Sequence, residues 1–159
     1  MSDAHFEIHT RWTGNLGSGT RDYRAYSRNH EVSALKKHAQ ILCSSDPAFR
    51  GDGSRYNPEE LLVASLSTCH MLWILHLCAD AGIEIVEYRD SATGTMSHHK
   101  DGSGEFTNVT LRPRMAITDA ARVQEATALH SKAHAMCFIA RSVNFPVTHE
   151  PVVTVASRT

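Results

Sequence analysis

The sequence has no run of like charges, no long uninterrupted apolar stretch, and no low-complexity linker or internal repeat. Its formal net charge is -1 and its pI is near 6.8, which excludes the basic footprint of a nucleic-acid-binding protein or a polybasic membrane patch. A transmembrane helix needs about 18 or more successive apolar residues, and none is present. We therefore expect neither nucleic acid nor membrane as a partner, and a small molecule or another protein instead.

The N-terminus, MSDAHFEIHTRW, also lacks the charged-then-apolar order of a secretory signal peptide. We therefore expect a cytoplasmic protein, in which cysteines are normally kept reduced. The four cysteines are Cys43, Cys69, Cys78 and Cys137. In that compartment a cysteine with a special environment is more often catalytic or metal-binding than part of a structural disulfide.

The composition, with 42% apolar and 21% charged residues, is that of an ordinary globular protein. A chain of 159 residues most simply forms one domain, so we predict a single domain over residues 1–159. Periodicity predicts strands at 5–12, 21–27 and 31–37, a loop at 44–56, a helix at 58–81, strands at 84–97 and 105–117, a helix from Thr118 or Asp119 to 135, and a strand at 147–156. This order predicts an α+β fold with a mainly antiparallel sheet.

The clearest strand pattern lies at 105–117, where apolar and polar residues alternate. We expect one buried face, formed by Val109, Leu111, Met115 and Ile117.

The helix expected at 58–81 begins with a strong capping signal. Asn57 can accept hydrogen bonds from free backbone N–H groups, Pro58 suits the first helical position, and Glu59 and Glu60 face the positive end of the helix dipole. Beyond this start the helix is apolar nearly all round, which predicts cover on every side. A second copy of the chain, in a homodimer, would supply the cover that one small monomer lacks.

Two cysteines of this helix point in opposite directions. Cys69 and Cys78 are nine residues apart, which corresponds to about 180° around the helix axis. Cys78 and Cys43 are expected to be small buried hydrophobic residues. Burial alone would leave Cys69 inert as well, so a reactive Cys69 needs a nearby cation that holds its thiolate.

The stretch NPEELLVASLSTC, which ends at Cys69, and a second cysteine 68 residues later in KAHAMC resemble the family of osmotically inducible protein C (OsmC) and organic hydroperoxide resistance protein (Ohr). The order of elements is also similar, so the resemblance covers most of the chain. It implies an OsmC-like α+β fold, with mainly antiparallel sheets packed around a long central helix, in an intertwined homodimer.

The resemblance further implies a thiol-dependent peroxidase that reduces organic hydroperoxides to alcohols and needs no organic cofactor. Cys69 would attack the peroxide and become a sulfenic acid, and Cys137 would resolve it as a disulfide. Glu59 would be the glutamate at the helix start. The reductant would be a small or lipoyl-type dithiol.

An arginine completes the site implied by the resemblance. Arg50, in AFRGDGSRYNPEE, resembles the arginine that one branch of the family places just before the motif. Other members take it from an earlier strand, where Arg21 or Arg24 would be the counterpart. The chemistry needs such a group, because a fixed cation stabilises both the attacking thiolate and the departing alkoxide. A glutamate can hold the guanidinium in place.

Two positions beside the thiols depart from the family pattern. Phe138 stands where the family commonly has proline, and His70 where it often has phenylalanine. From these differences we expect a less characterised branch of the family, with a different substrate or a weaker resolving step. Trp73, Met136 and Phe138, with Ile139, predict an apolar approach to the thiols that suits an alkyl tail.

Histidine spacing gives an alternative function. His130, His134 and Cys137 lie at i, i+4 and i+7, on one helix face, and Cys69 or His70 could complete a tetrahedral zinc site. A non-enzymatic ligand carrier on the same fold is a third alternative, without positive support in the sequence.

Helix geometry adds one expectation about Glu59. Ten residues separate it from Cys69, and on a continuous helix they span about 15 Å, so the two cannot touch. Two central helices that cross antiparallel in a dimer would instead bring Glu59 of one subunit to Cys69 of the other.

Overall fold

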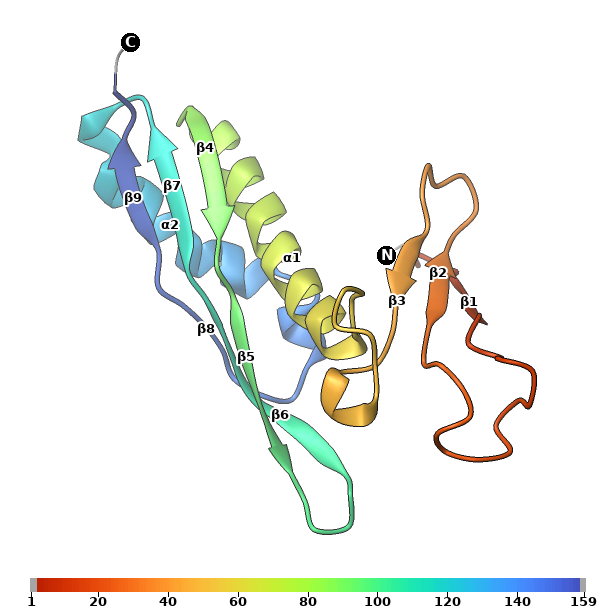
Figure 1. The fold of residues 1–159 in the computed structure, drawn as a ribbon. Coiled ribbons are helices and arrows are strands. Elements are labelled where there is room, and N and C mark those ends of the chain that lie inside the picture. The colour runs from red at the N-terminus through yellow and green to blue at the C-terminus, as the bar shows by residue number, and fades with distance from the viewer. Residues whose placement is uncertain (1–2, 158–159) are drawn as a thin grey trace. The chain divides into compact units, whose positions relative to one another are not determined.

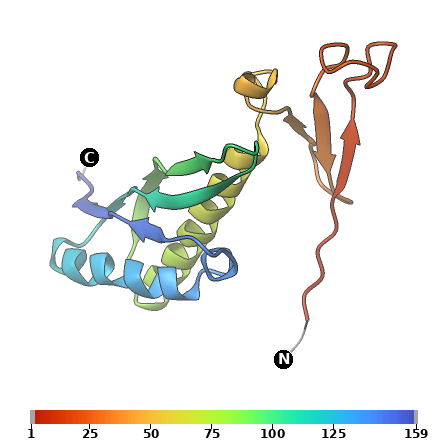
Figure 2. The same cartoon turned by 90° about the horizontal axis from the view of Figure 1, so that it is seen from below.

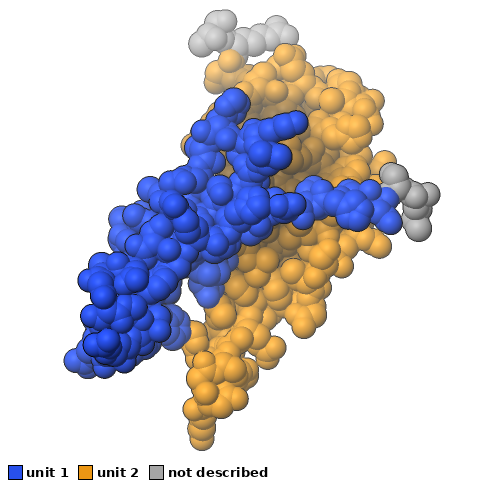
Figure 3. Space-filling model, turned by 90° about the vertical axis from the view of Figure 1, so that its right-hand side faces the viewer, with its two compact units in different colours: residues 1–61 blue, residues 62–159 orange. Residues whose placement is uncertain are grey.

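The computed structural model describes residues 3–157, and the chain divides into two compact units, residues 1–61 and 62–159 (Figure 3). Unit 1 is a three-stranded antiparallel sheet in the order β1-β2-β3, formed by β1 (His9–Trp12), β2 (His30–Ser33) and β3 (Ile41–Cys43). A short 3-10 helix, η1 (Pro47–Phe49), follows in the predicted loop. Cys43 is fully buried, as expected for a small hydrophobic residue.

The strand predicted at 21–27 is wrong, because this segment folds into turns between β1 and β2. The Asp22 side chain accepts a hydrogen bond from the backbone N–H of Arg24, and Arg28 donates to the carbonyls of Tyr23 and Tyr26. The Arg28 guanidinium also lies over both tyrosine rings. These side-chain contacts occupy groups that a strand would use in its ladder.

The strand predicted at 31–37 is shorter than expected, and a third strand was missed. β2 ends at Ser33, and Lys36 adopts a left-handed backbone conformation with φ of 65°. An extended strand cannot pass through that conformation, so the chain turns and returns as β3 at Ile41.

The predicted central helix is confirmed as α1 (Pro58–Asp80). The Asn57 side chain accepts from the backbone N–H of Glu60 (2.7 Å), and the Glu60 carboxylate accepts from the backbone N–H of Asn57 (3.0 Å). This reciprocal pair is a capping box, which satisfies two free donors at the helix start. At the other end Gly82 has a φ of 70°, and the N–H of Ile83 donates to the carbonyl of Cys78 (2.8 Å).

By length and composition α1 could cross a membrane, with a mean hydropathy of 1.7. The core helix of a globular protein meets the same criterion, and one face of α1 is buried in the core of unit 2. That face consists of Leu66, His70, Ile74, Leu77 and Cys78. The other apolar side chains, such as Leu72, are partly or largely exposed in the single chain.

Unit 2 contains two three-stranded sheets. The first has the order β4-β7-β9, from β4 (Ile85–Asp90), β7 (Pro113–Ile117) and β9 (Val152–Val155); the second has the order β5-β6-β8, from β5 (Thr93–His98), β6 (Gly104–Leu111) and β8 (Val147–His149). The pairs β4/β7 and β5/β6 are antiparallel, and β6/β8 and β7/β9 are parallel. With the pairs of unit 1, the pairing is mainly antiparallel, as predicted.

Each long strand predicted in unit 2 is interrupted and contributes to both sheets. The strand at 84–97 breaks between Asp90 and Thr93, and the strand at 105–117 breaks at Arg112, whose N–H donates to the Asp90 carboxylate (2.7 Å) instead of a neighbouring strand. The terminal strand breaks at Glu150 and Pro151, because proline has no N–H to donate to a ladder. The predicted buried face at 109–117 is confirmed.

The second helix, α2 (Val123–Met136), begins later than predicted. Asp119 does act as a cap, but for a preceding 3-10 turn, η2 (Ala120–Arg122), where its side chain accepts from the N–H of Ala121. α1 and α2 cover the same face of the sheets (Figures 1 and 2). Between them and the first sheet lies the main core cluster, which includes Ile74, Cys78, Met115, Ile117, Ala126 and Ala133.

Candidate active site

The structure brings the thiols of Cys69 and Cys137 into contact. Cys69 lies in the middle of α1 and is partly exposed, whereas Cys137 is the C-cap of α2 and is 2% exposed. Burial, followed by a hydrogen bond with the Cys69 thiol, raises the pKa of Cys137 to about 11. Cys137 is therefore a protonated thiol at neutral pH, able to donate a hydrogen bond to a Cys69 thiolate.

The chain after Cys137 folds back over the thiols. Cys137 has an extended backbone, which ends α2, and the short helix η3 (Ala140–Ser142) follows. The N–H of Ala140 donates to the Cys137 sulfur (3.4 Å), and the N–H of Arg141 donates to the Cys137 carbonyl (3.1 Å). The first bond holds the Cys137 sulfur, and the second holds its backbone, at the end of α2.

A largely apolar hollow of about 460 Å³ opens beside Cys69. Its lining residues are Ser65, Thr68, Cys69, Leu72, Trp73, His76, Phe138 and Ile139. The rings of Trp73 and Phe138 meet edge to face with centroids 5.6 Å apart. The predicted binding residues Trp73 and Phe138 therefore line the hollow together with a thiol, whereas Met136 is exposed and does not line it.

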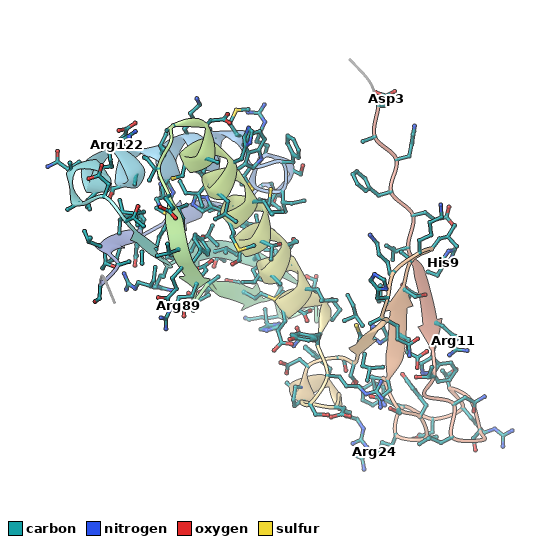
Figure 4. All side chains as sticks on the ribbon, turned by 90° about the horizontal axis from the view of Figure 1, so that it is seen from above. Asp3, His9, Arg11, Arg24, Arg89 and Arg122 are labelled. Carbon is teal, nitrogen blue, oxygen red and sulfur yellow. The ribbon has the colours of Figure 1, made fainter. Side chains whose placement is uncertain are left out.

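The other predicted catalytic residues belong to unit 1. Arg50 is the C-cap of η1, with a left-handed φ of 64°. Arg21 and Arg24 lie in the turns between β1 and β2, and Arg24 is marked in Figure 4. Glu59 is in the first turn of α1, which is continuous to Cys69 and beyond. The roles of these residues toward Cys69 stay predictions.

Unit 2 contains a cluster of four histidines, His70 of α1, His130 and His134 of α2, and His149 of β8. His70 and His130 are buried, and His134 and His149 are partly buried. Nε2 of His70 and Nδ1 of His130 are hydrogen-bonded at 2.9 Å, and the two ring planes are nearly parallel, at 19°. His149 lies between His70 and His134, with ring centroids 5.5 Å and 5.3 Å away.

Burial is the main cause that lowers the pKa of His70, His130 and His149. It lowers the pKa of His70 to about 4, assisted by His149 and His134, and lowers that of His130 to about 3, assisted by His70 and His149. The pKa of His149 is lowered for the same reasons, burial first and then His134. All of these shifts favour neutral imidazole.

The zinc site proposed from the spacing of His130, His134 and Cys137 has no geometric support. Within residues 3–157 no three histidine, cysteine or acidic side chains are arranged to hold a metal ion. His130 directs Nδ1 at His70, and Cys137 faces Cys69. His130 and Cys137 therefore each bond to a residue of α1 and do not converge on one point.

Sequence analysis did not single out His149. A signal existed, because the two-residue period of a strand places His149 on the same face as Val147, which packs in a core cluster. The pairing of His70 with His130 has no comparable signal, since the two are distant in the sequence.

Comparison with known proteins identifies the family of this chain. A model of the family described as OsmC-like protein matches residues 51–151. An OsmC-like protein of unknown function from Vibrio cholerae O1 biovar eltor has a solved structure with 29% sequence identity and a TM-score of 0.84, which covers 94% of this chain and 100% of that one. The uncharacterized protein YmaD of Bacillus subtilis (strain 168) is 22% identical over 147 residues, 90% of this chain and 89% of the relative.

A third relative carries a functional description. The structure of an organic hydroperoxide resistance protein, OsmC, from Legionella pneumophila has 20% identity and a TM-score of 0.66, with 96% of this chain and 99% of that chain covered. At this identity the likeness shows the shared fold. The family match covers most of the chain, so this protein belongs to the OsmC-like family, and the α+β OsmC-like fold predicted from NPEELLVASLSTC and KAHAMC is confirmed.

Proposed function

We propose that this protein is a thiol-dependent peroxidase that reduces organic hydroperoxides to alcohols, with Cys69 as the attacking thiol and Cys137 as the resolving thiol. The observation that carries the proposal is the contact of the two thiols at the edge of an apolar hollow. Membership of a family that includes organic hydroperoxide resistance proteins supports it. The geometry gives no support to the zinc-binding alternative.

The first chemical step takes place at Cys69, which is the more exposed of the two thiols. Its thiolate attacks the terminal oxygen of the hydroperoxide, so an S–O bond forms and the O–O bond breaks. Cys69 becomes a sulfenic acid, and the alkoxide leaves and takes a proton to become the alcohol. Cys137, held as a thiol by its raised pKa, donates a hydrogen bond that stabilises the Cys69 thiolate before attack.

The second step uses Cys137. Its sulfur attacks the sulfur of the sulfenic acid, the S–O bond breaks, and the hydroxyl leaves as water with the thiol proton. The product is a Cys69–Cys137 disulfide, which an external small or lipoyl-type dithiol reduces by exchange. The contact between the thiols favours this closure over further oxidation of Cys69.

The substrate is an organic hydroperoxide because the hollow is lined mainly by apolar side chains. Leu72, Trp73 and Phe138 can bury an alkyl or aromatic tail beside Cys69. Hydrogen peroxide has no such tail and gains nothing from these side chains.

The site is completed in a homodimer. α1 leaves apolar side chains such as Leu72 exposed in the single chain, and a second copy would cover them. Arg50, or Arg21 or Arg24 in its place, would stabilise the thiolate, and Glu59 would orient that arginine. Because Glu59 is about 15 Å from Cys69 along α1, it would act on the partner subunit's site. We place this chemistry in the cytoplasm, where a reducing dithiol is available.

The experiment mixes fully reduced protein with cumene hydroperoxide or with hydrogen peroxide and follows peroxide and free thiols together. The proposal predicts that one cumene hydroperoxide is consumed for each two thiols lost, and that cumene hydroperoxide reacts faster than hydrogen peroxide. Peroxide that persists beside fully reduced thiols would rule the function out, and favour the ligand carrier.

A further inference from the structure

The two helices that carry the cysteines approach each other through apolar contacts. Ile74 of α1 and Ala126 and Ala133 of α2 belong to one core cluster. Dispersion contacts of this kind have little directionality, and helices packed in this way can shift by about 1–2 Å. The separation of Cys69 and Cys137 therefore needs a more directional constraint.

Two side-chain hydrogen bonds supply directional links. Nη2 of Arg122, at the start of α2, donates to the carbonyl of Ala81, just after α1 (2.9 Å). Toward the other end, Nε2 of His70 and Nδ1 of His130 join the helices directly (2.9 Å). Since a hydrogen bond tolerates little change in length or angle, each bond restricts the sliding of one helix along the other.

The histidine link lies close to the thiols. His70 follows Cys69 directly, and His130 precedes Cys137 by two helical turns, about 10 Å along the axis. A helix is stiff along its axis, so a shift of His130 along the axis of α2 moves Cys137 by a similar distance. Disulfide closure requires Cα atoms within about 4.4–6.8 Å of each other, and a shift of an ångström or two is a large part of that range.

Burying this histidine pair in the core costs stability. His70 is 1% exposed and His130 is fully buried. The described residues offer no hydrogen-bond partner to Nδ1 of His70 or to Nε2 of His130. Apolar side chains would fill the space without leaving buried nitrogens unpaired, so stability does not explain the pair.

The surroundings of the pair favour neutral rings. Burial lowers the pKa of His70, nearby His149 of β8 and His134 of α2 lower it further, and Asp90 of β4 is the acidic group that acts on His70. The Asp90 carboxylate is already engaged by the hydroxyl of Ser67 (2.6 Å) and the N–H of Arg112 (2.7 Å). Two neutral rings that share one proton form a bond that either tautomer can satisfy.

We propose that the His70–His130 hydrogen bond is a positioning link, which holds Cys137 in register with Cys69 for disulfide closure. Its biological role rests on the proposed peroxidase function, but the link itself can be tested without peroxide. His70 and His130 are positioning residues in this scheme and do not touch the substrate.

The test measures disulfide closure in oxidised glutathione. The Cys69 thiolate attacks one glutathione sulfur and releases the first glutathione thiolate. The Cys137 thiolate then displaces the second, so the protein is oxidised by two electrons and glutathione disulfide is reduced to two thiols. Acid quenching and mass spectrometry follow the lifetime of the mixed disulfide on Cys69, which reports the closure step alone.

Three variants separate positioning from stability. His70→Phe keeps a ring and removes the bond, His70→Gln places an amide where Nε2 lies and retains a bond to His130, and Arg122→Gln removes the distant link as a matched control. We expect the mixed disulfide to live about tenfold to a hundredfold longer in His70→Phe. His70→Gln and Arg122→Gln should close nearly as fast as the wild type, because the bond near the thiols remains.

The proposal is overturned if His70→Phe closes at the wild-type rate, if His70→Gln is as slow as His70→Phe, or if Arg122→Gln slows closure equally. Circular dichroism checks the fold of each variant first, and His130→Leu breaks the same bond from α2 if His70→Phe does not fold. If the wild-type protein forms the Cys69–Cys137 disulfide in oxidised glutathione but does not reduce peroxide, the proposed function is rejected and the positioning link stands. If it reduces peroxide but the rate of disulfide closure does not depend on His70, only the positioning link is rejected.

Discussion

Acidification should destabilise this protein through its buried histidines. The folded-state pKa of His70 is about 4 and that of His130 about 3, against an ordinary value of 6.5. Between these values the unfolded chain binds protons that the folded chain does not, so the free energy of unfolding falls as the pH falls from about 6.5 toward 4. Above pH 6.5 both states hold neutral rings and the effect disappears.

The magnitude follows from the size of the shift. For His70 a difference of about 2.5 pKa units is worth about 3 kcal/mol when fully expressed, and about 2 kcal/mol of it is lost by pH 5. His130 contributes a similar loss by pH 5, although the two are in contact and their contributions are not strictly additive. Such a loss is a large part of the stability of a typical domain.

Urea unfolding at a fixed protein concentration, at about pH 7.5 and about pH 5, measures this loss. His70→Gln cannot be protonated there, so it should lose about 2 kcal/mol less than the wild type between the two conditions. His38→Gln, a change at an exposed histidine, is the matched control and should behave as the wild type does. An equal acid loss in His70→Gln and the wild type would refute the buried, neutral state of His70.

Three further predictions concern the site. Cys137 should be alkylated slowly at neutral pH in the folded Cys69→Ser variant and faster as the pH rises, and alkylation as fast as in urea would contradict its burial. Phe138→Ala should raise KM for cumene hydroperoxide by about tenfold with little effect on hydrogen peroxide, because it opens one wall of the hollow; equal effects on both would remove Phe138 from substrate binding. Mixing Cys69→Ser with Glu59→Gln under subunit exchange should restore activity, and verified heterodimers without activity would place Glu59 outside the partner's site.

The parts of the fold predicted correctly are those with local signals. Asn57 and Glu60 are three residues apart and form their capping box within one turn, so the start of α1 could be read from NPEE. The buried alternation from Val109 to Ile117 is likewise a property of one short stretch. Family membership rests on equally local motifs.

The errors occur where distant residues decide the local structure. The long strand at 105–117 breaks because the N–H of Arg112 bonds to Asp90, which belongs to another strand. The sequence of residues 21–27 favours a strand, but the Arg28 guanidinium donates to the carbonyls of Tyr23 and Tyr26, and the segment forms turns. The pairing of His70 with His130 joins two helices, and no periodicity of either helix predicts it. The single domain over residues 1–159 stays a prediction.

The central claim is the division of labour between the two thiols, and trapping the sulfenic acid tests it most directly. Cys137→Ser should consume one equivalent of cumene hydroperoxide and accumulate a sulfenic acid on Cys69, which dimedone labels and mass spectrometry locates. Cys69→Ser should consume none and form no adduct. Full turnover by Cys69→Ser would contradict the account, and so would a dimedone adduct on Cys137 in that variant.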